Sequence, residues 1–447
     1  MEGLLAAIIV KNGTITINNC YNEGKVNGGS GIIGQSRGTV AITNCYNKAE
    51  VTGCKNAYIG GLAGQTGGGT IDNCYNEGKV SGDSSYAGGI VGLSEGTTTI
   101  TNSHNSAEVT GSGQYAGGLA GLIYAGATID NCYNEGKVSG GSIGNGGIVG
   151  SVGSVGSTTA TITNSYNKAD VSGGFAGGIV GQMNGTIDGC YNVGTISGDS
   201  HVGGISGQGG NVYNSFNRGN ISAKIDVSDG CGGIVGYGYG GTVKNCYNEG
   251  NVKTNDGHIG GIAGFASSVS NAFNKGNIEN DASFVGGIAG SVGDGDVDNC
   301  YNAGNVSGKG RLIGGIVATG KAISNSFNHG NIKVGANSDS STGPCGGIAG
   351  SAGPISNCYN SGDIDPKGSL IYEIAYGTST NSFYQKKDSN AITTGGTELS
   401  KEDMDKKMDL SYFLSLLNTK VEENNKDTSK TKLKKWKLEN GNLSFAE

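Results

Sequence analysis

Residues 69–96 read GTIDNCYNEGKVSGDSSYAGGIVGLSEG, and variants of this stretch recur along most of the chain. The string Asn-Cys-Tyr-Asn, or a close variant, begins at 14 positions from Asn19 to Asn381, at intervals of 24 to 33 residues. A second block, Gly-Gly-Ile/Leu-x-Gly, lies between successive copies, as at 88–92. Self-similarity at such a period indicates a repeat protein, in which each unit stacks on its neighbours.

Each repeat holds three short β-type segments, as at 70–75, 79–81 and 86–93. They are rich in Ile, Val, Tyr and Thr and are bounded by Gly, Asn, Asp or Ser, which is the pattern of strands and turns. A helical period appears only after residue 398. We therefore predict an all-β fold, a parallel β-helix (β-solenoid) of about 13 coils over residues 1–384, in which each strand pairs with its counterpart one coil on.

Glycine supplies 88 of the 447 residues, against 3 prolines. That share is close to three times the usual ~7 % and excludes an ordinary helical globule. Collagen is excluded because it needs glycine at every third position and abundant proline. Disorder is excluded because 35 % hydrophobic and 15 % charged residues are the reverse of its signature. The glycines instead allow the tight corners and close backbone approach that stacked coils require.

A recurring asparagine marks one corner of the repeat. Side-chain amides stacked on neighbouring coils can bond to one another and to exposed backbone. We predict a structural asparagine ladder there rather than a ligand site. Its members include Asn76, Asn105, Asn134, Asn167 and Asn192.

Cysteine alternates with serine or alanine at one position of the repeat from residue 74 onward. Cysteines two coils apart are about 9.6 Å from each other, beyond the ~7 Å Cα limit for a disulfide. We interpret them as small buried fillers. Cys20 and Cys45 are the one pair predicted in adjacent coils, and therefore the pair to test for oxidation.

Residues 385–447 differ in composition and hold only 3 of the glycines. Ser400 and Asp403 resemble a helix-capping arrangement, and the apolar residues that follow predict a helix at about 400–418. Asn440-Gly441 is the favoured two-residue hairpin turn, which predicts a hairpin at about 434–445. We interpret this segment as a small α+β cap over the last coil.

Charge and hydropathy exclude two classes of partner. Residues 1–384 carry 18 basic and 26 acidic residues, a net charge of −8, without the basic stripe that nucleic acid binding needs. The longest apolar run, Leu4 to Val10, has seven residues, far fewer than the ~20 of a membrane span. We therefore expect no nucleic acid partner and no direct membrane insertion.

The sequence shows no constellation typical of catalysis or metal binding. It has no Cys-x-x-Cys pair, no zinc spacing and no His-Glu-x-x-His. The densest acidic group is Asp294, Asp296 and Asp298, in a Gly-rich turn without the regular Asp of calcium-binding repeats. We predict no catalytic residue, no metal and no cofactor, and thus no enzyme.

Two features remain as candidate binding surfaces. A stripe of rings stands two positions before the Gly-Gly pair. It shares parity with the apolar position of Ile90, which favours an inward orientation; facing outward, it could stack on sugar rings or on a partner protein. Insertions at 151–160, 223–230 and 334–344 are either binding loops or drift tolerated at the surface. The stripe consists of Tyr58, Tyr86, Tyr115, Phe175, His201, His258 and Phe284.

The repeats resemble the GLUG-motif repeat family in their Asn-Cys-Tyr-Asn-x-Gly and Gly-Gly-Ile/Leu-x-Gly blocks, over roughly residues 3–384. The tail, with LSLLN and WKLENGNLSF, also looks like the segment that often follows such arrays. The family occurs in bacterial surface and secreted proteins, including adhesins and the N-terminal regions of IgA-specific metallopeptidases, so the resemblance implies an extracellular location. These residues contain no peptidase motif and no cell-wall sorting signal, so proteolysis and covalent anchoring do not carry over.

We expect a non-enzymatic, adhesin-like protein at the bacterial cell surface that presents a binding face or acts as a stalk. A host glycan or an extracellular protein is the expected partner. One alternative is a carbohydrate-active β-helix enzyme, which three carboxylates converging in one groove would favour. The other is a self-assembling filament or surface-layer subunit, because uncapped β-edges can associate end to end.

Overall fold

The computed structural model describes residues 13–53, 58–83, 86–153, 160–226, 229–280, 284–309, 311–335, 343–365, 371–384, 396–398, 410–427, 435–439 and 442–445. The chain forms two compact units. Unit 1 comprises Met1–Asn211 and Arg218–Ser222, and unit 2 comprises Val212–Asn217 and Ala223–Glu447. Each is a parallel β-solenoid, and together they hold about 12 turns. The predicted fold class is confirmed, with about one turn fewer than the repeat count suggested.

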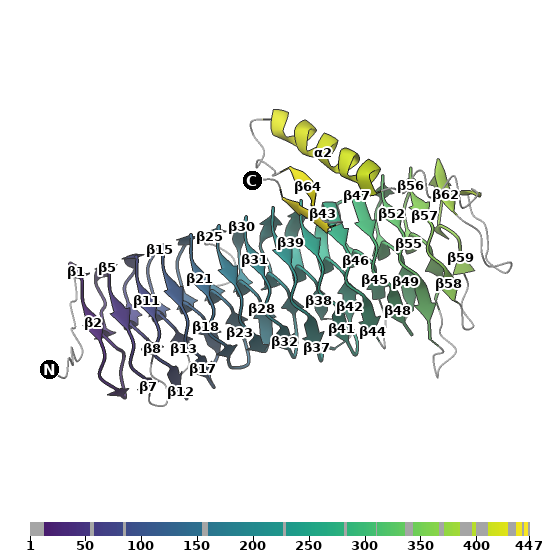
Figure 1. Cartoon of the computed structure of the whole chain (residues 1–447). Coiled ribbons are helices and arrows are strands. Elements are labelled where there is room, and N and C mark those ends of the chain that lie inside the picture. The colour runs from purple at the N-terminus through teal and green to yellow at the C-terminus, as the bar shows by residue number, and fades with distance from the viewer. Residues whose placement is uncertain are drawn as a thin grey trace. The chain divides into compact units, whose positions relative to one another are not determined.

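One turn of unit 1 shows the plan. It runs through β10 (Gly69–Asp72), β11 (Tyr75–Asn76), β12 (Val80–Gly82), β13 (Tyr86–Gly88) and β14 (Val91–Ser94). Each strand pairs in parallel with the equivalent strand of the next turn. Within each unit of Figure 1, equivalent strands of successive turns lie side by side. Residues of the same repeat position therefore form columns along each unit.

Unit 1 repeats these five strands with small changes in length. The strands equivalent to β10 are β1 (Thr14–Asn18), β5 (Thr39–Thr43), β15 (Thr98–Thr101), β20 (Ala127–Asp130), β25 (Ala160–Thr163) and β30 (Gly185–Asp188). Those equivalent to β11 are β2 (Tyr21–Asn22), β6 (Tyr46–Asn47), β16 (His104–Asn105), β21 (Tyr133–Asn134), β26 (Tyr166–Asn167) and β31 (Tyr191–Asn192). Those equivalent to β12 are β3 (Val26–Asn27), β7 (Val51–Gly53), β17 (Val109–Gly111), β22 (Val138–Ser139), β27 (Val171–Gly173) and β32 (Ile196–Gly198). Those equivalent to β13 are β8 (Tyr58–Gly60), β18 (Tyr115–Gly117), β23 (Gly144–Gly146), β28 (Phe175–Gly177) and β33 (Val202–Gly203). Those equivalent to β14 are β4 (Ile33–Gln35), β9 (Ala63–Thr66), β19 (Ala120–Ile123), β24 (Val149–Val152), β29 (Val180–Met183) and β34 (Ser206–Gln208).

Unit 2 follows the same order, but some neighbouring strands merge into longer ones. The chain passes between the units within β35 (Asn211–Tyr213) and β37 (Ile221–Ala223). The first turns of unit 2 contain β36 (Phe216–Asn217), β38 (Gly230–Gly232), β39 (Val235–Lys244), β40 (Tyr247–Asn248), β41 (Val252–Thr254), β42 (His258–Gly260), β43 (Ala263–Asn274), β44 (Ile278–Asn280), β45 (Phe284–Gly286), β46 (Ala289–Val292) and β47 (Val297–Asn302). The later turns contain β48 (Val306–Gly308), β49 (Leu312–Gly314), β50 (Val317–Gly320), β51 (Ile323–Ser324), β52 (Phe327–Asn328), β53 (Ile332–Val334), β54 (Cys345–Gly346), β55 (Ala349–Ala352), β56 (Ile355–Ser356), β57 (Tyr359–Asn360), β58 (Ile364–Asp365), β59 (Ile371–Tyr372), β60 (Ala375–Tyr376), β61 (Ser379–Thr380) and β62 (Ser382–Tyr384).

The core of each turn is a few aliphatic side chains that stack on their counterparts. In unit 1 one cluster is formed by Val26, Val51, Ile59, Val80, Ala87 and Val109, none of which exposes more than 5 % of its surface. The Gly-Gly block leaves no room for larger residues, since a Cβ on Gly89 would collide with the Gly118 carbonyl oxygen and with the Asn105 side chain. Glycine there lets the backbones of adjacent turns approach closely.

The C-terminal segment belongs to unit 2. β63 (Gly396–Glu398) adds a parallel strand to β62 of the last turn. The helix α2 (Leu410–Lys426) overlaps the predicted helix, whose residues 400–409 lie outside the described residues, and β64 (Trp436–Glu439) pairs antiparallel with β65 (Asn442–Phe445). The predicted Asn-Gly turn lies outside the described residues.

α2 does not cover the end of the last coil. It lies on the flank of unit 2, beside β43 and β47 (Figure 1), with its Val421 and Leu414 against the rings of β40, β43, β47 and β52. The capping role of residues 385–447 as a whole stays a prediction. The flank offers α2 an apolar surface, which its own apolar face can bury.

Candidate functional site

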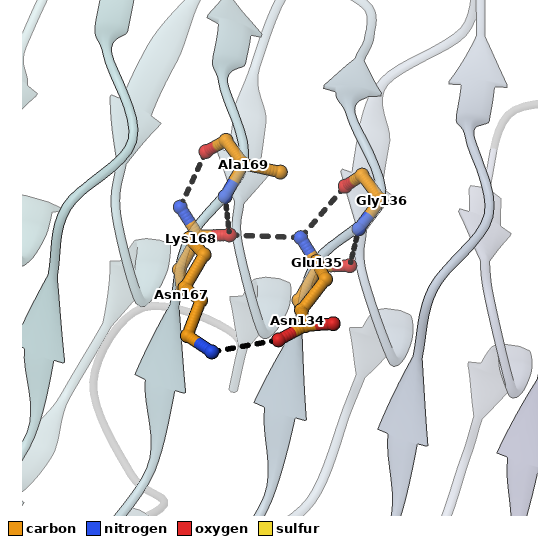
Figure 2. Close-up of polar contacts among 6 residues, drawn as sticks. All are labelled: Asn134, Glu135, Gly136, Asn167, Lys168 and Ala169. Carbon is orange, nitrogen blue, oxygen red and sulfur yellow. Dashed lines mark hydrogen bonds and ion pairs between the residues drawn. The ribbon is translucent and has the colours of Figure 1, made fainter.

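The predicted asparagine ladder is confirmed. Asn134 Nδ2 donates to Asn167 Oδ1 at 2.8 Å and to the Gly136 carbonyl at 2.8 Å, while the Gly136 amide donates to Asn134 Oδ1 (Figure 2). The same side-chain bond joins successive turns in both units at 2.7–2.9 Å. These amides are buried and bonded to one another, which supports a structural role.

A second asparagine column was not anticipated. The first Asn of each Asn-Cys-Tyr-Asn string has a left-handed backbone, with φ of 50° at Asn73 and 47–56° at its counterparts. Glycine takes the position once, at Gly189, with φ of 66°. Asn and Gly are the residues that tolerate this region best. The replacement of Asn by Gly at this one repeat position was a sequence signal for the left-handed backbone.

An aromatic column runs along the turns next to the buried asparagines. In unit 1 its rings stack at 4.5–5.2 Å with interplanar angles of 4–8°. Tyr21 is 60 % exposed, and the other members are half-buried, because stacking covers ring faces and leaves edges in solvent. The column in unit 1 consists of Tyr21, Tyr46, Tyr75, His104, Tyr133, Tyr166 and Tyr191.

Charged groups lie beside this open column. Lys168 forms an ion pair with Glu135 at 2.8 Å (Figure 2), and its Nζ lies 5.0 Å from the centre of the Tyr166 ring. Lys48 lies in the same way over Tyr46. Partial burial lowers the pKa of His104 below its usual value, so this member of the column is neutral at pH 7.

In unit 2 the middle of the same column is covered, while Phe216, Tyr359 and Phe383 are half-buried. Tyr247, Phe273, Tyr301 and Phe327 are 1–8 % exposed and form one cluster with Val421 of α2. Burial raises the pKa of Tyr301 to about 12. Phe alternates with Tyr here, and this loss of hydroxyl groups was a sequence signal that the column would be covered. The column in unit 2 consists of Phe216, Tyr247, Phe273, Tyr301, Phe327, Tyr359 and Phe383.

A third column differs between the units. In unit 1 this column is formed by the residue that directly precedes β12 and its equivalent strands, and it alternates between Lys and an acidic residue. Ion pairs join neighbouring turns, Lys25 to Glu50 at 2.7 Å and Lys79 to Glu108 at 2.8 Å. These ion pairs hold the pKa of Glu50 and of Glu108 below the usual range. In unit 2 the position is asparagine in four successive turns and aspartate in the next. Each asparagine side-chain oxygen accepts the amide hydrogen of the equivalent residue one turn on, at 2.9–3.0 Å. The residues are Asn251, Asn277, Asn305, Asn331 and Asp363.

The predicted stripe is half-buried in each of its seven members. Tyr58, Tyr86 and Tyr115 stack at 5.3 and 5.6 Å, and Phe175 stacks on His201. Gly144 pairs with Tyr115 on one side and with Phe175 on the other, so it interrupts the row. In unit 2, His258 stacks on Phe284 at 4.4 Å. The neighbouring positions, such as Ala87, are fully buried, so the stripe rings are less buried than the core.

The remaining predicted features are the three insertions and the acidic group that contains Asp298. The central parts of the three insertions lie outside the described residues. Asp298 accepts hydrogen bonds from Ser324 and Asn325 at 2.7 Å and thus serves the corner of its turn. Among the described residues, no group of three or more His, Cys, Asp or Glu side chains is placed to hold a metal ion.

The cysteine column holds one more adjacent pair than predicted. Cys74 lies in the turn after Cys45, so Cys20, Cys45 and Cys74 occupy three successive turns. The prediction that Cys20 and Cys45 form the one adjacent pair is therefore wrong. All three are free thiols, as are the other described cysteines.

Three successive repeats of unit 1 match the GLUG motif, at residues 55–81, 83–110 and 112–139. The chain thus carries GLUG motifs at the spacing that the repeat indicates. A crystal structure of a candidate immunoglobulin A1 protease from Bacteroides ovatus is similar at 15 % identity and a TM-score of 0.21, covering 94 % of this chain and 86 % of that one. No curated protein matches the chain. No helix in the described part of the chain combines the length and hydropathy of a membrane span.

Proposed function

We propose that the chain is a non-enzymatic, adhesin-like repeat protein of a bacterial surface, and that its binding face is the open aromatic column of unit 1. The observation that carries the proposal is the contrast at one repeat position. In unit 2 a helix of the same chain covers four rings of the column, whereas in unit 1 Tyr21 is exposed and the equivalent residues of the later turns are half-buried.

The partner that fits this column is a protein. The rings of unit 1 face one another, so inside the column no ring face is free for a sugar to stack on. What repeats along the surface is a ring edge with a phenol hydroxyl, flanked by Lys and Glu. Tyrosine is favoured at protein interfaces because it offers large apolar area with a polar tip. The helix on unit 2 supplies the precedent for a polypeptide on this column.

The location outside the cell and the absence of enzymatic activity are parts of the proposal. The GLUG motifs support the location through the resemblance described above. The sequence contains no catalytic motif that would favour the β-helix enzyme. Incubation with a panel of host polysaccharides tests that alternative, and release of reducing ends or of unsaturated products would contradict the proposal.

Binding to arrays of extracellular proteins and of host glycans tests the proposed face. The decisive variant is Tyr75→Phe/Tyr133→Phe/Tyr166→Phe, which keeps the rings and their stacking but removes three hydroxyl groups. We expect it to bind at least about tenfold more weakly to a protein that the unchanged chain recognises, since each lost interfacial hydrogen bond costs about 0.5–1.5 kcal/mol.

The matched variant is Tyr86→Phe/Tyr115→Phe in the stripe, which we expect to bind normally. Loss of binding in the stripe variant alone would move the site to the stripe. Binding to glycans alone, unchanged by the column variant, would contradict the proposed face and the protein partner.

A further inference from the structure

Cysteine and serine alternate along the cysteine column, and Cys45 departs from that alternation. In most turns cysteine and serine alternate, and the serine hydroxyl accepts the amide hydrogen of the cysteine in the preceding turn. Ser103 Oγ accepts from the Cys74 amide at 3.0 Å, and Ser165 Oγ from the Cys132 amide at 3.1 Å. Each serine also donates to a carbonyl two residues back, as Ser103 does to Thr101 at 2.7 Å. The alternation therefore has a structural reason.

Cys45 stands where this alternation places a serine. Its sulfur accepts from the Cys20 amide at 3.3 Å, and its thiol donates to the Thr43 carbonyl at 3.1 Å. A thiol is a weaker donor and acceptor than a hydroxyl, so cysteine does the structural work of this position less well. What cysteine adds is contact among three thiols in successive turns, those of Cys20, Cys45 and Cys74.

The spacing of the turns brings these thiols into bonding range. Tyr21, Tyr46 and Tyr75, which follow the three cysteines, are direct register partners in parallel strands. Neighbouring strands are about 4.8 Å apart, within the 4.4–6.8 Å range of Cα separations across a disulfide. Cysteines two turns apart, such as Cys74 and Cys132, are about twice as far and outside it.

The three thiols differ in access and acidity. Cys20 is half-buried, whereas Cys45 and Cys74 are buried. The neighbouring Cys74 is the main cause that lowers the pKa of Cys45 to about 7. The neighbouring Cys45, followed by burial, raises the pKa of Cys74, and the Cys74 thiol donates to the Asp72 carbonyl at 3.2 Å. Burial and the neighbouring Cys45 raise the pKa of Cys20.

We propose that Cys20 and Cys45 are a reversible oxidation site, whose disulfide joins the first two described turns of unit 1. The oxidant is a low-molecular-weight disulfide, RSSR. Cys20 loses its proton to solvent and attacks one sulfur of RSSR, which releases RS⁻ and leaves Cys20 as a mixed disulfide. Cys45 then loses its own proton to solvent, and its thiolate attacks the Cys20 sulfur and releases the second RS⁻.

The reaction balances as one RSSR and two protein thiols giving one protein disulfide and two RSH. The protein loses two electrons and two protons, and excess thiol reverses the reaction. Solvent accessibility sets the order of the two reactions. The half-buried Cys20 reacts with RSSR first, and the buried Cys45 then reacts with the mixed disulfide on Cys20. The result is a covalent link between the first two described turns of the unit.

Glutathione disulfide at pH 8, followed by alkylation of free thiols and peptide mapping by mass spectrometry, tests the proposal on the full chain. We expect a Cys20–Cys45 cross-linked peptide and free Cys74 and Cys132. In Cys45→Ser, the repeat's own residue for this position, we expect the cross-link to vanish and glutathione to remain on Cys20. Cys132→Ser, which changes an isolated buried thiol, should behave like the unchanged chain.

Unmodified Cys20, a persistent mixed disulfide in the unchanged chain, or a Cys45–Cys74 cross-link in place of Cys20–Cys45 would each overturn the proposal.

Discussion

In unit 1 the aromatic column is open and the neighbouring corner alternates between Lys and Glu, whereas in unit 2 a helix covers the column and asparagine occupies that corner. The asparagine ladder is common to both units, with the same side-chain bonds at the same distances. The bonds that join successive turns at this corner are therefore the same in both units. The aromatic column is buried under α2 in unit 2 and partly exposed in unit 1, so its surroundings can change without changing the fold.

Ring truncation should separate the units most strongly. Tyr301→Ala in the covered column removes a buried ring, and we expect it to cost about 3 kcal/mol of unfolding free energy in unit 2. Tyr133→Ala in the open column loses mainly stacking and should cost about 1 kcal/mol in unit 1. Hydrogen exchange with peptide-level mass spectrometry reads the two units separately. Equal losses would mean that α2 does not bury the column.

The asparagine ladder should show no difference between the units. Asn134→Ala and Asn302→Ala each leave buried donors and acceptors without partners, and we expect each to cost about 2 kcal/mol in its own unit. Thr128→Ala, at an exposed position of unit 1, is the control and should change stability by less than about 0.5 kcal/mol. The same exchange measurement applies. A neutral result at either asparagine would show that its amide is replaceable by water.

Loosening α2 should affect unit 2 alone. Val421→Ala removes part of a fully buried side chain over the aromatic cluster, and we expect a loss of about 1–2 kcal/mol in the protection of α2 and β47. Ser415→Ala, at an exposed position of the same helix, should leave that protection unchanged. Equal protection in the two variants would show that Val421 does not pack on the aromatic rings.

Lowering the pH should give the smallest difference between the units. Only unit 1 should lose stability through the ion pairs of its Lys/Glu column. The folded-state pKa values of Glu50 and Glu108 lie below their ordinary value of 4.5, lowered chiefly by hydrogen bonds from Lys25 and Lys79. Their stabilisation is therefore complete above the unfolded pKa and is lost as pH falls through the folded one. Both pairs are solvent-exposed, so the effect is small and weakens with salt.

Thermal unfolding followed by hydrogen exchange between pH 7 and pH 3 measures this effect. Lys25→Ala/Lys79→Ala should remove part of the acid response of unit 1 and leave unit 2 as it was. An acid response in unit 2 alone would contradict the assignment of these carboxylates.

The repeat made the fold predictable because every turn repeats the same spacing, and the asparagine ladder followed from one recurring corner residue. The left-handed backbone of Asn73 and its counterparts was missed, although Gly189 at the same position was a signal for it. The site of α2 was also missed, because an amphipathic pattern shows that a helix has a partner but not which surface the partner is. Phe273 and Phe327, which replace the tyrosines of unit 1, were the clue.

The stripe and the cysteines teach the same lesson. Parity along a strand favoured inward rings at Tyr86 and Tyr115, but they are half-buried, since stacking covers part of each ring. The period of the cysteines was read from residue 74 onward, and Cys45 broke it one turn earlier. Departures from a repeat carry information that the average repeat conceals.

The most direct test of the account is hydroxyl-radical footprinting of the tyrosines in the full chain. Equivalent residues of one column are compared, so intrinsic reactivity cancels. We predict strong modification of Tyr21, which is 60 % exposed, measurable modification of the half-buried Tyr133 and Tyr166, and less of Tyr247 and Tyr301, which are 1 % and 8 % exposed. Equal modification of the two sets would contradict the claim that one column is open and the other covered.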